Sequence, residues 1–308
     1  MTCRIVFMGS PQFAIPTLRA LQRHFDVVGV FSQADRPSGR GKILKATPVK
    51  KLALEMGIEY AEPEDLKDPN VLNVLNQWKP DVIVVVAYGK FLPLEILDLP
   101  PLGCLNLHAS LLPRHRGPSP IANAILSADK ETGNTVMLMD TGMDTGKILA
   151  QQVVRIGEKD SAGDLHDKLM ELGSSLVVET LDKWKTNDIN PIPQDNSKAT
   201  YTRLLRKGDG FLDWNLDAKQ LDRLVRAMNP WPGAFFVIGR EQIKVWNATP
   251  IEGQAEPGLI ADITSNGVIL GTGAGLLRLD EIQAPSKKKV SGADFARGRR
   301  LKFGDYLI

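Results

Sequence analysis

The 308-residue sequence has few cysteines and histidines, and this scarcity argues against several kinds of site. Its two cysteines, Cys3 and Cys104, make neither a disulfide framework nor a zinc site, so we expect a protein of the reducing cytoplasm. It contains no His-Glu-x-x-His or Cys-x-x-Cys motif, and we therefore predict no metal centre. Cys104 lies among apolar residues in GCLNL, which favours a buried packing thiol over a catalytic nucleophile.

Other absences narrow the class further. No apolar run is long enough to span a bilayer, so we expect no membrane association. The first residues, MTCRIVFMGSP, are typical of a first core strand rather than of a secretory signal. FMGSPQFA lacks the G-x-G-x-x-G motif, which argues against a dinucleotide-binding site. The sequence also has no G-x-x-x-x-G-K-[ST] phosphate-binding loop, which argues against nucleotide hydrolysis.

Charge is distributed unevenly along the chain, although the net charge is only +2. Residues 191–308 hold 17 Lys and Arg against 13 Asp and Glu, whereas residues 1–190 hold 21 against 23. The last 22 residues carry seven bases and two acids. A basic C-terminal end suits a polyanionic partner, and a solvated terminal face explains it equally well.

The first half of the chain alternates apolar strand patterns with helical ones. DVIVVVAYG (81–89) is a near-continuous apolar run, as in a strand that is covered on both faces. TPVKKLALEMG (47–57) has the cap signals of a helix, with Thr47 as N-cap, Pro48 at the first helical position and Gly57 as the stop. This alternation predicts an α/β fold with a doubly wound, mostly parallel, Rossmann-like sheet.

The second half has a different pattern. Residues 189–206 are polar and carry two prolines, which is typical of a linker. After an amphipathic helix over 216–228, which Asp217 and Gln220 begin with a capping box, five short strands follow one another between turn residues. We therefore predict a catalytic domain at 1–188, a linker at 189–206 and a small C-terminal β-barrel of oligonucleotide-binding (OB-like) type at 207–308.

Four polar loops follow strands of the predicted parallel sheet. They are QADRPSGRGK (33–42), AYGKFLP (87–93), HASLLPRHRGP (108–118) and DTGMDTG (140–146). In doubly wound sheets ligands bind beyond the carboxyl ends of the strands. We therefore expect the four loops to border one crevice.

The segment GCLNLH (103–108) places two polar residues at the end of a strand. Asn106 and His108 are two residues apart, so both side chains leave the same face of the strand. An amide donor beside an imidazole suits oxyanion stabilisation and proton transfer in acyl transfer. Asp140 and Asp144 supply carboxylates, and one beside His108 would favour its protonated, donating form. The alternative is ordinary loop hydrogen bonding at a polar strand end.

These motifs resemble those of a known family. NLHASLLPRHRGPSP followed by DTGMDTG resembles the signature of the formyltransferases that use 10-formyltetrahydrofolate. QADRPSGRGK, VVAYGKFLP and NPWPG resemble the branch that acts on initiator tRNA, and the resemblance covers nearly the whole chain. It implies transfer of a formyl group from 10-formyltetrahydrofolate to the amine of methionine on initiator methionyl-tRNA, without a metal. The implied partners are folate and this tRNA, and we expect a monomer with no obligate protein partner.

The resemblance also assigns residues to roles. The catalytic trio falls on Asn106, His108 and Asp144, whereas His24, His115 and His166 are expected to be structural or solvated. The folate-contacting stretch falls on Ser110, Leu111, Leu112 and Pro113, and the pterin pocket on Tyr88, Gly89, Phe91, Leu92 and Asp140. RHRG (114–117) is expected to be a basic rim.

Nine basic residues are predicted to bind tRNA. Those of the loop QADRPSGRGKILK would enter the acceptor stem, with Arg40 as the key residue, unless this is simply a solvated loop. Those of the C-terminal domain would hold the inside of the tRNA. The nine are Arg36, Arg40, Lys42 and Lys45 in the loop and Lys287, Lys288, Lys289, Arg299 and Arg300 in the C-terminal domain.

Two other functions compete with this one. An amino-sugar nucleotide formyltransferase shares the trio and the fold, but it has no need of the GRGK loop or of a basic C-terminus. A non-catalytic RNA-binding module explains the basic residues, but it has no use for Asn106 and Asp144.

Overall fold

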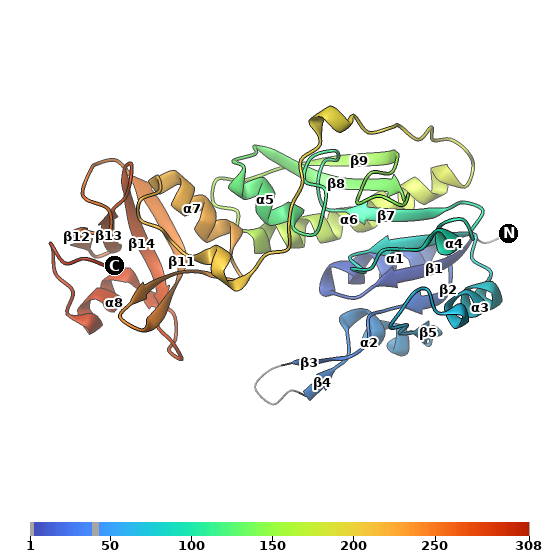
Figure 1. The fold of residues 1–308 in the computed structure, drawn as a ribbon, viewed down its shortest axis with the longest axis horizontal. Coiled ribbons are helices and arrows are strands. Elements are labelled where there is room, and N and C mark those ends of the chain that lie inside the picture. Colours follow the sequence, from blue (N-terminus) through green and yellow to red (C-terminus); the bar gives the residue numbers. More distant parts are fainter. Residues whose placement is uncertain (1–2, 39–42, 308) are drawn as a thin grey trace. The chain divides into compact units, whose positions relative to one another are not determined.

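The computed structural model describes residues 3–38 and 43–307, and the chain forms two compact units (Figure 1). The first comprises Met1–Pro120, Glu131–Arg155 and His166–Arg203. The second comprises Ile121–Lys130, Ile156–Leu165 and Leu204–Ile308. Each unit therefore has its own core and is described by itself.

The first unit is built on a seven-stranded sheet with the order β5-β2-β1-β6-β7-β8-β9. The pairings from β5 to β7 are parallel, whereas β8 and β9 extend the sheet in antiparallel. Every residue of β6 is buried, as its continuous apolar run predicts. The strands are β1 (Arg4–Gly9), β2 (Asp26–Phe31), β5 (Tyr60–Ala61), β6 (Val82–Val86), β7 (Cys104–His108), β8 (Glu131–Leu138) and β9 (Ile148–Arg155).

Helices cover both faces of this sheet. α3 (Pro69–Trp78) and α4 (Leu94–Leu97) pack in one apolar cluster with residues of β1, β6 and β7. On the other face, the ring of Phe13, just before α1 (Ile15–His24), lies 5.2 Å from that of His166 in α6 (Ala162–Trp184). α2 (Pro48–Glu55) contacts α1 and begins with the predicted cap, in which the Thr47 hydroxyl accepts from the Lys50 N–H. The predicted doubly wound fold is confirmed.

The second unit is an antiparallel β domain. Its six-stranded sheet has the order β10-β11-β14-β13-β12, with β15 paired to β14. A capping box of Asp217 and Gln220 begins α7, as the sequence predicts, and its apolar face packs in the core of the domain. The elements are α5 (Pro120–Leu126), α7 (Ala218–Ala227), β10 (Ala234–Ile238), β11 (Glu241–Ile251), β12 (Ile260–Thr264), β13 (Gly267–Gly271), β14 (Leu276–Gln283), β15 (Val290–Ser291) and α8 (Gly292–Arg299). The predicted small β domain is thereby confirmed.

Backbone hydrogen bonds hold residues 189–203 to the rest of the first unit. Ile192 exchanges backbone hydrogen bonds with Ile148 at the start of β9. Arg116 does the same with Thr200 and Thr202. The segment also contains a short 3-10 helix, η2 (Asn196–Lys198), and a second one, η3 (Lys207–Gly210), follows it. Residues 189–203, a linker by composition, therefore belong structurally to the first unit.

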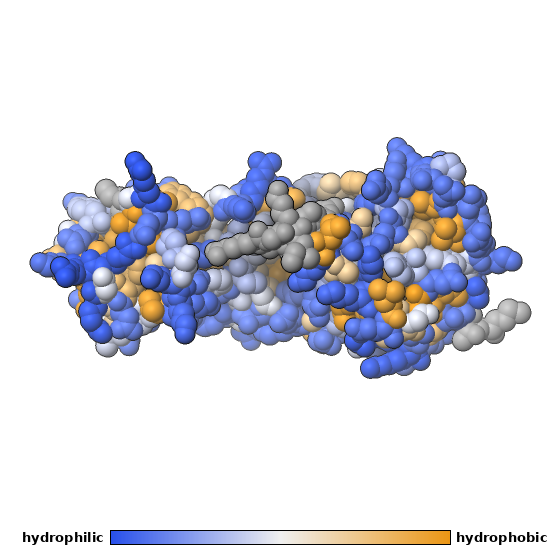
Figure 2. All heavy atoms as spheres, turned by 90° about the horizontal axis from the view of Figure 1, so that it is seen from below, coloured by the Kyte–Doolittle hydropathy of each residue, from blue (hydrophilic) through white to orange (hydrophobic). Residues whose placement is uncertain are grey.

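The face of the protein that Figure 2 shows is largely polar. On the face shown in Figure 2, apolar residues form separate patches among hydrophilic ones. Among the residues that the structure describes, no helix combines the length and the apolar character needed to cross a membrane.

Candidate active site

Strand β7 presents Asn106 and His108 on one face, as the spacing predicts. It pairs with the parallel β6 on one side and the antiparallel β8 on the other, which fixes both residues in the middle of the sheet. Asn106 is half-buried, and its side chain makes no hydrogen bond to any described residue. Its amide is therefore available to a ligand.

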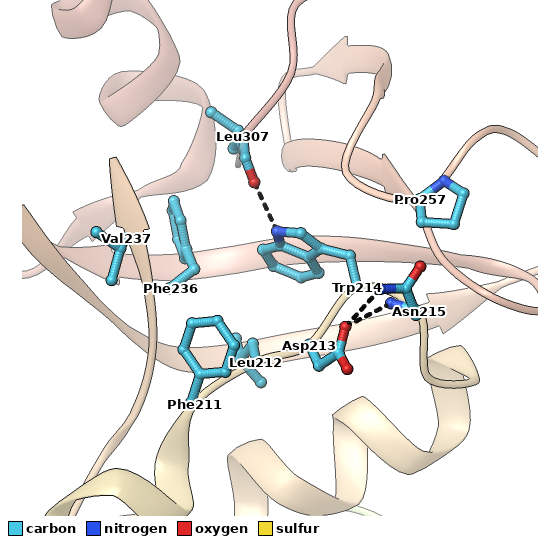
Figure 3. A pocket seen from close by; sticks show the side chains of 9 residues that line it. All are labelled: Phe211, Leu212, Asp213, Trp214, Asn215, Phe236, Val237, Pro257 and Leu307. Atoms are coloured by element: carbon cyan, nitrogen blue, oxygen red, sulfur yellow. Dashed lines mark hydrogen bonds between the residues drawn. The ribbon is translucent and has the colours of Figure 1, made fainter. Parts of the chain in front are cut away.

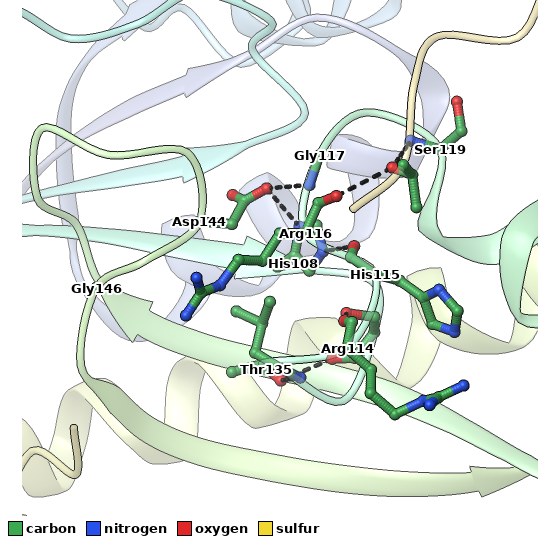
Figure 4. A network of polar contacts seen from close by, with 12 residues as sticks. His108, Arg114, His115, Arg116, Gly117, Ser119, Thr135, Asp144 and Gly146 are labelled. Carbon is green, nitrogen blue, oxygen red and sulfur yellow. Dashed lines mark hydrogen bonds and ion pairs between the residues drawn. The ribbon is translucent and has the colours of Figure 1, made fainter. Parts of the chain in front are cut away.

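His108 is 7% exposed and is held through both ring nitrogens (Figure 4). Nε2 lies 2.9 Å from the backbone carbonyl oxygen of His115. A carbonyl oxygen only accepts, so Nε2 carries a hydrogen and donates it there. Nδ1 lies 3.6 Å from Oδ2 of Asp144, within the range of an ion pair but longer than a hydrogen bond. Nδ1 is therefore the ring nitrogen that a reacting group can use.

Asp144 is aimed at His108 by its backbone and by Gly117. Its φ is +54°, a left-handed conformation that Asp and Asn adopt more easily than other non-glycine residues. Its Oδ2 accepts a 2.7 Å hydrogen bond from the Gly117 N–H. Gly117 itself has φ +106°, and a Cβ there would lie 2.6 Å from the carbonyl oxygen of Thr202. Only glycine fits this position, and Gly117 is not among the residues predicted from the sequence to form the site.

The loop that carries Asp144 reaches His108 by an unexpected route. β8 is antiparallel to β7, so Leu138 at the end of β8 pairs with Leu105 near the start of β7. The Met139 N–H donates to the Cys104 carbonyl, and the loop then runs back along β7 until Asp144 faces His108. We expected this loop, like the other three, to follow a parallel strand at its carboxyl end. That expectation is wrong, because β8 is antiparallel to β7. Asp144 nevertheless lies beside His108, as predicted.

The loop RHRG is not a uniform basic rim. Arg114 is exposed, but Arg116 is 1% exposed, and its guanidinium donates to Gln194, Asn196 and Tyr201. The prediction of a rim is therefore wrong for Arg116. His115 is buried, consistent with a structural role, and its carbonyl is the acceptor for His108.

The predicted folate-contacting stretch is only partly accessible. Ser110 is buried, and its hydroxyl donates to the Arg114 carbonyl. Leu112 is buried as well, and its N–H donates to the Thr135 hydroxyl. Leu111 and Pro113 are half-buried and are the two that a ligand can touch by side chain.

A cavity of about 470 Å³ opens beside Asp140. Its walls include Leu97, Cys104 and Met139, and Asp140 and Thr141 add polar groups. Burial, with a contribution from the charge of Asp98, raises the pKa of the Cys104 thiol to about 12. The thiol is thus an inert part of the wall, as the sequence predicts.

The predicted pterin-pocket residues differ in exposure. Phe91 is 69% exposed, whereas Tyr88 and Leu92 are buried in the core beneath α3 and α4. The Tyr88 carbonyl accepts from Nε2 of Gln33, and Gly89 follows with φ +76°. Of the five, Asp140 lines the cavity of about 470 Å³, and the other four do not.

Tyr88→Phe is expected to raise the free energy of unfolding by about 1–2 kcal/mol. The Tyr88 hydroxyl is buried without a hydrogen-bond partner among the described residues, and its burial raises the pKa to about 12. Urea unfolding measures the change, with Tyr201→Phe as the opposite case because that hydroxyl accepts from Arg116. A loss of stability in Tyr88→Phe would contradict the prediction, and weaker folate binding would show that the ligand uses the hydroxyl.

The nine predicted tRNA-binding residues are described unevenly. Arg40 and Lys42 lie outside the described residues, as does the side chain of Arg36. Lys45 is exposed on β4 (Ile43–Lys45), which pairs with β3 (Arg36–Ser38) in a two-stranded antiparallel sheet. The five of the second unit are exposed; they are Lys287, Lys288, Lys289, Arg299 and Arg300.

Two of these exposed cations already have partners. Lys289 lies 3.2 Å from Glu281 and 3.9 Å from the centre of the Trp246 ring. Arg299 pairs with Glu241. Exposed pairs of this kind contribute about 0–1 kcal/mol, so a polyanion can displace them at little cost.

A second cavity, of about 340 Å³, lies wholly within the second unit (Figure 3). It is lined by Phe211, Trp214 and Phe236 among other residues, and Trp214 donates to the Leu307 carbonyl. None of the predicted site residues lines it. Within residues 3–38 and 43–307, no group of three or more His, Cys, Asp or Glu is placed to hold a metal ion.

Two sequence families match the chain. Residues 3–181 match the formyl transferase family, and residues 204–300 match the formyl transferase C-terminal domain. The chain belongs to the formyl transferase family.

The full-length relatives are more specific. The methionyl-tRNA formyltransferase of Clostridium novyi is 42% identical, over 99% of both chains. That of Roseiflexus castenholzii is 44% identical, over 100% of this chain and 99% of its own.

Solved structures share the fold at low identity. HypX from Aquifex aeolicus in complex with tetrahydrofolic acid has a TM-score of 0.63 and 19% identity, covering 96% of this chain and 47% of its own. WlaRD, a sugar 3N-formyl transferase in the presence of dTDP and 5-N-formyl-THF, has a TM-score of 0.68 and 17% identity, covering 94% of this chain and all of its own.

Proposed function

We propose that this protein transfers the formyl group of 10-formyltetrahydrofolate to the amine of methionyl initiator tRNA. The observation that carries the proposal is identity of 42–44% to methionyl-tRNA formyltransferases over the whole chain, both units included. The sugar formyltransferase that shares the fold is only 17% identical. Because charged initiator tRNA is its substrate, we place the enzyme in the cytoplasm.

The reaction forms one carbon–nitrogen bond and breaks another. The methionyl amine attacks the formyl carbon, and the carbonyl oxygen becomes an oxyanion. Collapse of this tetrahedral species breaks the bond to N10 of the folate. One proton leaves the attacking nitrogen and one reaches N10, which gives N-formylmethionyl-tRNA and tetrahydrofolate.

Asn106 and His108 are placed to stabilise the oxyanion. The Asn106 amide has no hydrogen bond to described residues, so it can donate to the formyl oxygen without breaking a protein contact. Nε2 of His108 is committed to the His115 carbonyl, so Nδ1 is the ring nitrogen left for the formyl oxygen, and it donates when the imidazole carries its second proton. Two fixed donors then face the place where negative charge develops.

Asp144 is placed to handle the proton of the attacking amine. Its Oδ2 lies 3.6 Å from His108 Nδ1, and the Gly117 N–H holds it there. A carboxylate at this point accepts the proton that the amine loses. Proton delivery to N10 then follows from the same carboxyl group.

The cavity beside Asp140 suits the pterin end of the donor. Apolar walls with a few polar groups at one edge are typical of sites for a flat heterocycle. Asp140 accepts from the Gly142 N–H and the Thr145 hydroxyl through Oδ1, and Oδ2 remains for a ligand N–H. When bound there, the donor supplies the activated formyl group.

The chain division fits this function. We propose a catalytic domain at 1–188, a connection at 189–206 and a tRNA-binding domain at 207–308; the limits of the two matching family domains, 3–181 and 204–300, support it. The exposed cations of the second unit neutralise tRNA phosphates.

A parallel acceptor assay tests the function. The enzyme and 10-formyltetrahydrofolate are incubated with methionyl initiator tRNA, charged elongator tRNA and an amino-sugar nucleotide. We expect formylation of the initiator tRNA. Formylation of the sugar nucleotide alone would overturn the proposal.

Arg40→Ala is expected to raise the KM for initiator tRNA about tenfold and to lower the slope of log affinity against log salt concentration by about one. Folate binding should not change, because a phosphate contact acts only on the tRNA. Steady-state kinetics at several salt concentrations measure both, with the exposed Lys183→Ala as control. Equal losses of tRNA and folate affinity would count against the predicted role.

A further inference from the structure

Arg116 is a fully buried cation next to the two residues that hold the catalytic side chains. Its neighbour His115 supplies the carbonyl that accepts from His108, and its neighbour Gly117 supplies the N–H that donates to Asp144. Any movement of the Arg116 backbone therefore moves the supports of both catalytic residues.

The guanidinium is bound entirely by neutral groups. Nε and Nη2 donate to Oε1 of Gln194 at 3.1 and 2.8 Å, Nη2 also donates to Asn196, and Nη1 donates to the Tyr201 hydroxyl. None of the described carboxylates forms an ion pair with it. A lysine has no planar fork with which to reach three acceptors at once, so the arginine is specifically required.

Gln194 carries this network onward to the catalytic loop. Its Nε2 donates to the carbonyl of Asp144 at 2.9 Å and to that of Gly146 at 2.7 Å. The orientation of the amide is unambiguous, because the nitrogen faces two acceptors and the oxygen faces a cation. Arg116 therefore contacts the Asp144 backbone through Gln194, in addition to supporting the Asp144 side chain through Gly117.

The backbone closes the arrangement into a ring. The Arg116 N–H donates to the Thr200 carbonyl at 2.8 Å, and the Thr202 N–H donates to the Arg116 carbonyl at 2.7 Å. Segment 189–203 thereby fixes loop 113–117 by its backbone and loop 140–146 by Gln194. These hydrogen bonds connect the loops that hold His108 and Asp144, and they use no atom that the proposed reaction needs.

We propose that Arg116 and Gln194 are positioning residues that set the distance between His108 and Asp144. This proposal rests on the proposed function for the roles of that pair. Misplacing a catalytic group by about 1 Å costs on the order of 10²-fold in rate. Loss of either residue should therefore lower kcat and leave the KM values for donor and acceptor almost unchanged.

Three variants separate positioning from simple stability. Arg116→Lys keeps the charge and loses the fork, and we expect kcat to fall about tenfold or more. Gln194→Glu keeps an acceptor for Arg116 but removes both donors to the catalytic loop, and we expect a fall of about 10–100-fold. Lys198→Met is the control, because Lys198 lies on the same segment with a side chain 74% exposed.

The assay reports kcat and both KM values per folded protein, with folding followed by thermal unfolding. A near-normal kcat in both Arg116→Lys and Gln194→Glu would overturn the proposal. A kcat that falls only in proportion to unfolded protein would overturn it as well. The variants are compared on whichever acceptor the wild type formylates, so an error in the acceptor assignment appears in the wild type and not in this comparison.

Discussion

Asp144→Asn is expected to lower turnover by about 10²–10⁴-fold while the protein remains folded. The substitution removes the negative charge that faces His108 Nδ1 at 3.6 Å, and with it the base that we propose for the proton of the attacking amine. This is the largest single loss that the site predicts, because one atom, Oδ2, serves both purposes.

The asparagine should fit the same backbone. Asn tolerates the left-handed conformation of residue 144, where φ is +54°. Its side-chain oxygen can still accept from the Gly117 N–H, so the loop keeps its main support. The change is therefore confined to the charge and the proton-accepting atom.

Single-turnover formylation at saturating donor measures the effect. Asp167→Asn is the matched control, because Asp167 also pairs with a histidine, His166 at 2.9 Å, but its side chain is 77% exposed on α6. The control should turn over normally. Near-wild-type turnover in Asp144→Asn would sink the assigned role.

Asn106→Ala is expected to lower kcat by about 10²–10³-fold, the usual cost of one oxyanion donor. The Asn106 side chain makes no hydrogen bond to described residues, so truncation leaves no protein group without a partner. The free energy of unfolding should accordingly stay within about 0.5 kcal/mol of the wild type. A large kinetic loss without a loss of stability is the expected signature.

Asn134→Ala is expected to lose stability and keep its kcat, the opposite of Asn106→Ala, if the Asn106 amide is an oxyanion donor. Asn134 on β8 is fully buried, and its amide donates to the Leu169 carbonyl of α6. Its loss should destabilise the fold by about 1–3 kcal/mol with little change in kcat per folded protein. If Asn106→Ala also lost stability rather than rate, the amide would be a structural group.

Features that depend only on neighbouring residues have the predicted geometry in the structure, because that geometry is local. The two-residue spacing of Asn106 and His108 fixes a common face in any strand, and β7 shows it. The capping box of Asp217 and Gln220 needs only four consecutive residues, and it is present at α7. The environment of Cys104 followed from its apolar neighbours in the same way.

Arg116 shows where a local argument fails. In the sequence it is one of two arginines around His115, and composition alone suggests a solvated basic rim. Its burial depends on Gln194, 78 residues further on, in a segment whose polar composition indicates a linker. No pattern within either segment predicts the contact between Arg116 and Gln194.

The sequence by itself determined the strand that carries Asn106 and His108 on one face, the carboxylate that we propose to act with them, and two units of different architecture. These follow from residue type and from periods of two or 3.6 residues, which are properties of short stretches. Only the tertiary structure decided how Asp144 reaches His108, by a loop that folds back from an antiparallel strand, and what holds it there. Those contacts join Gly117, Asp144 and Gln194 across long stretches of chain, and their partners are set by packing, which no local period encodes.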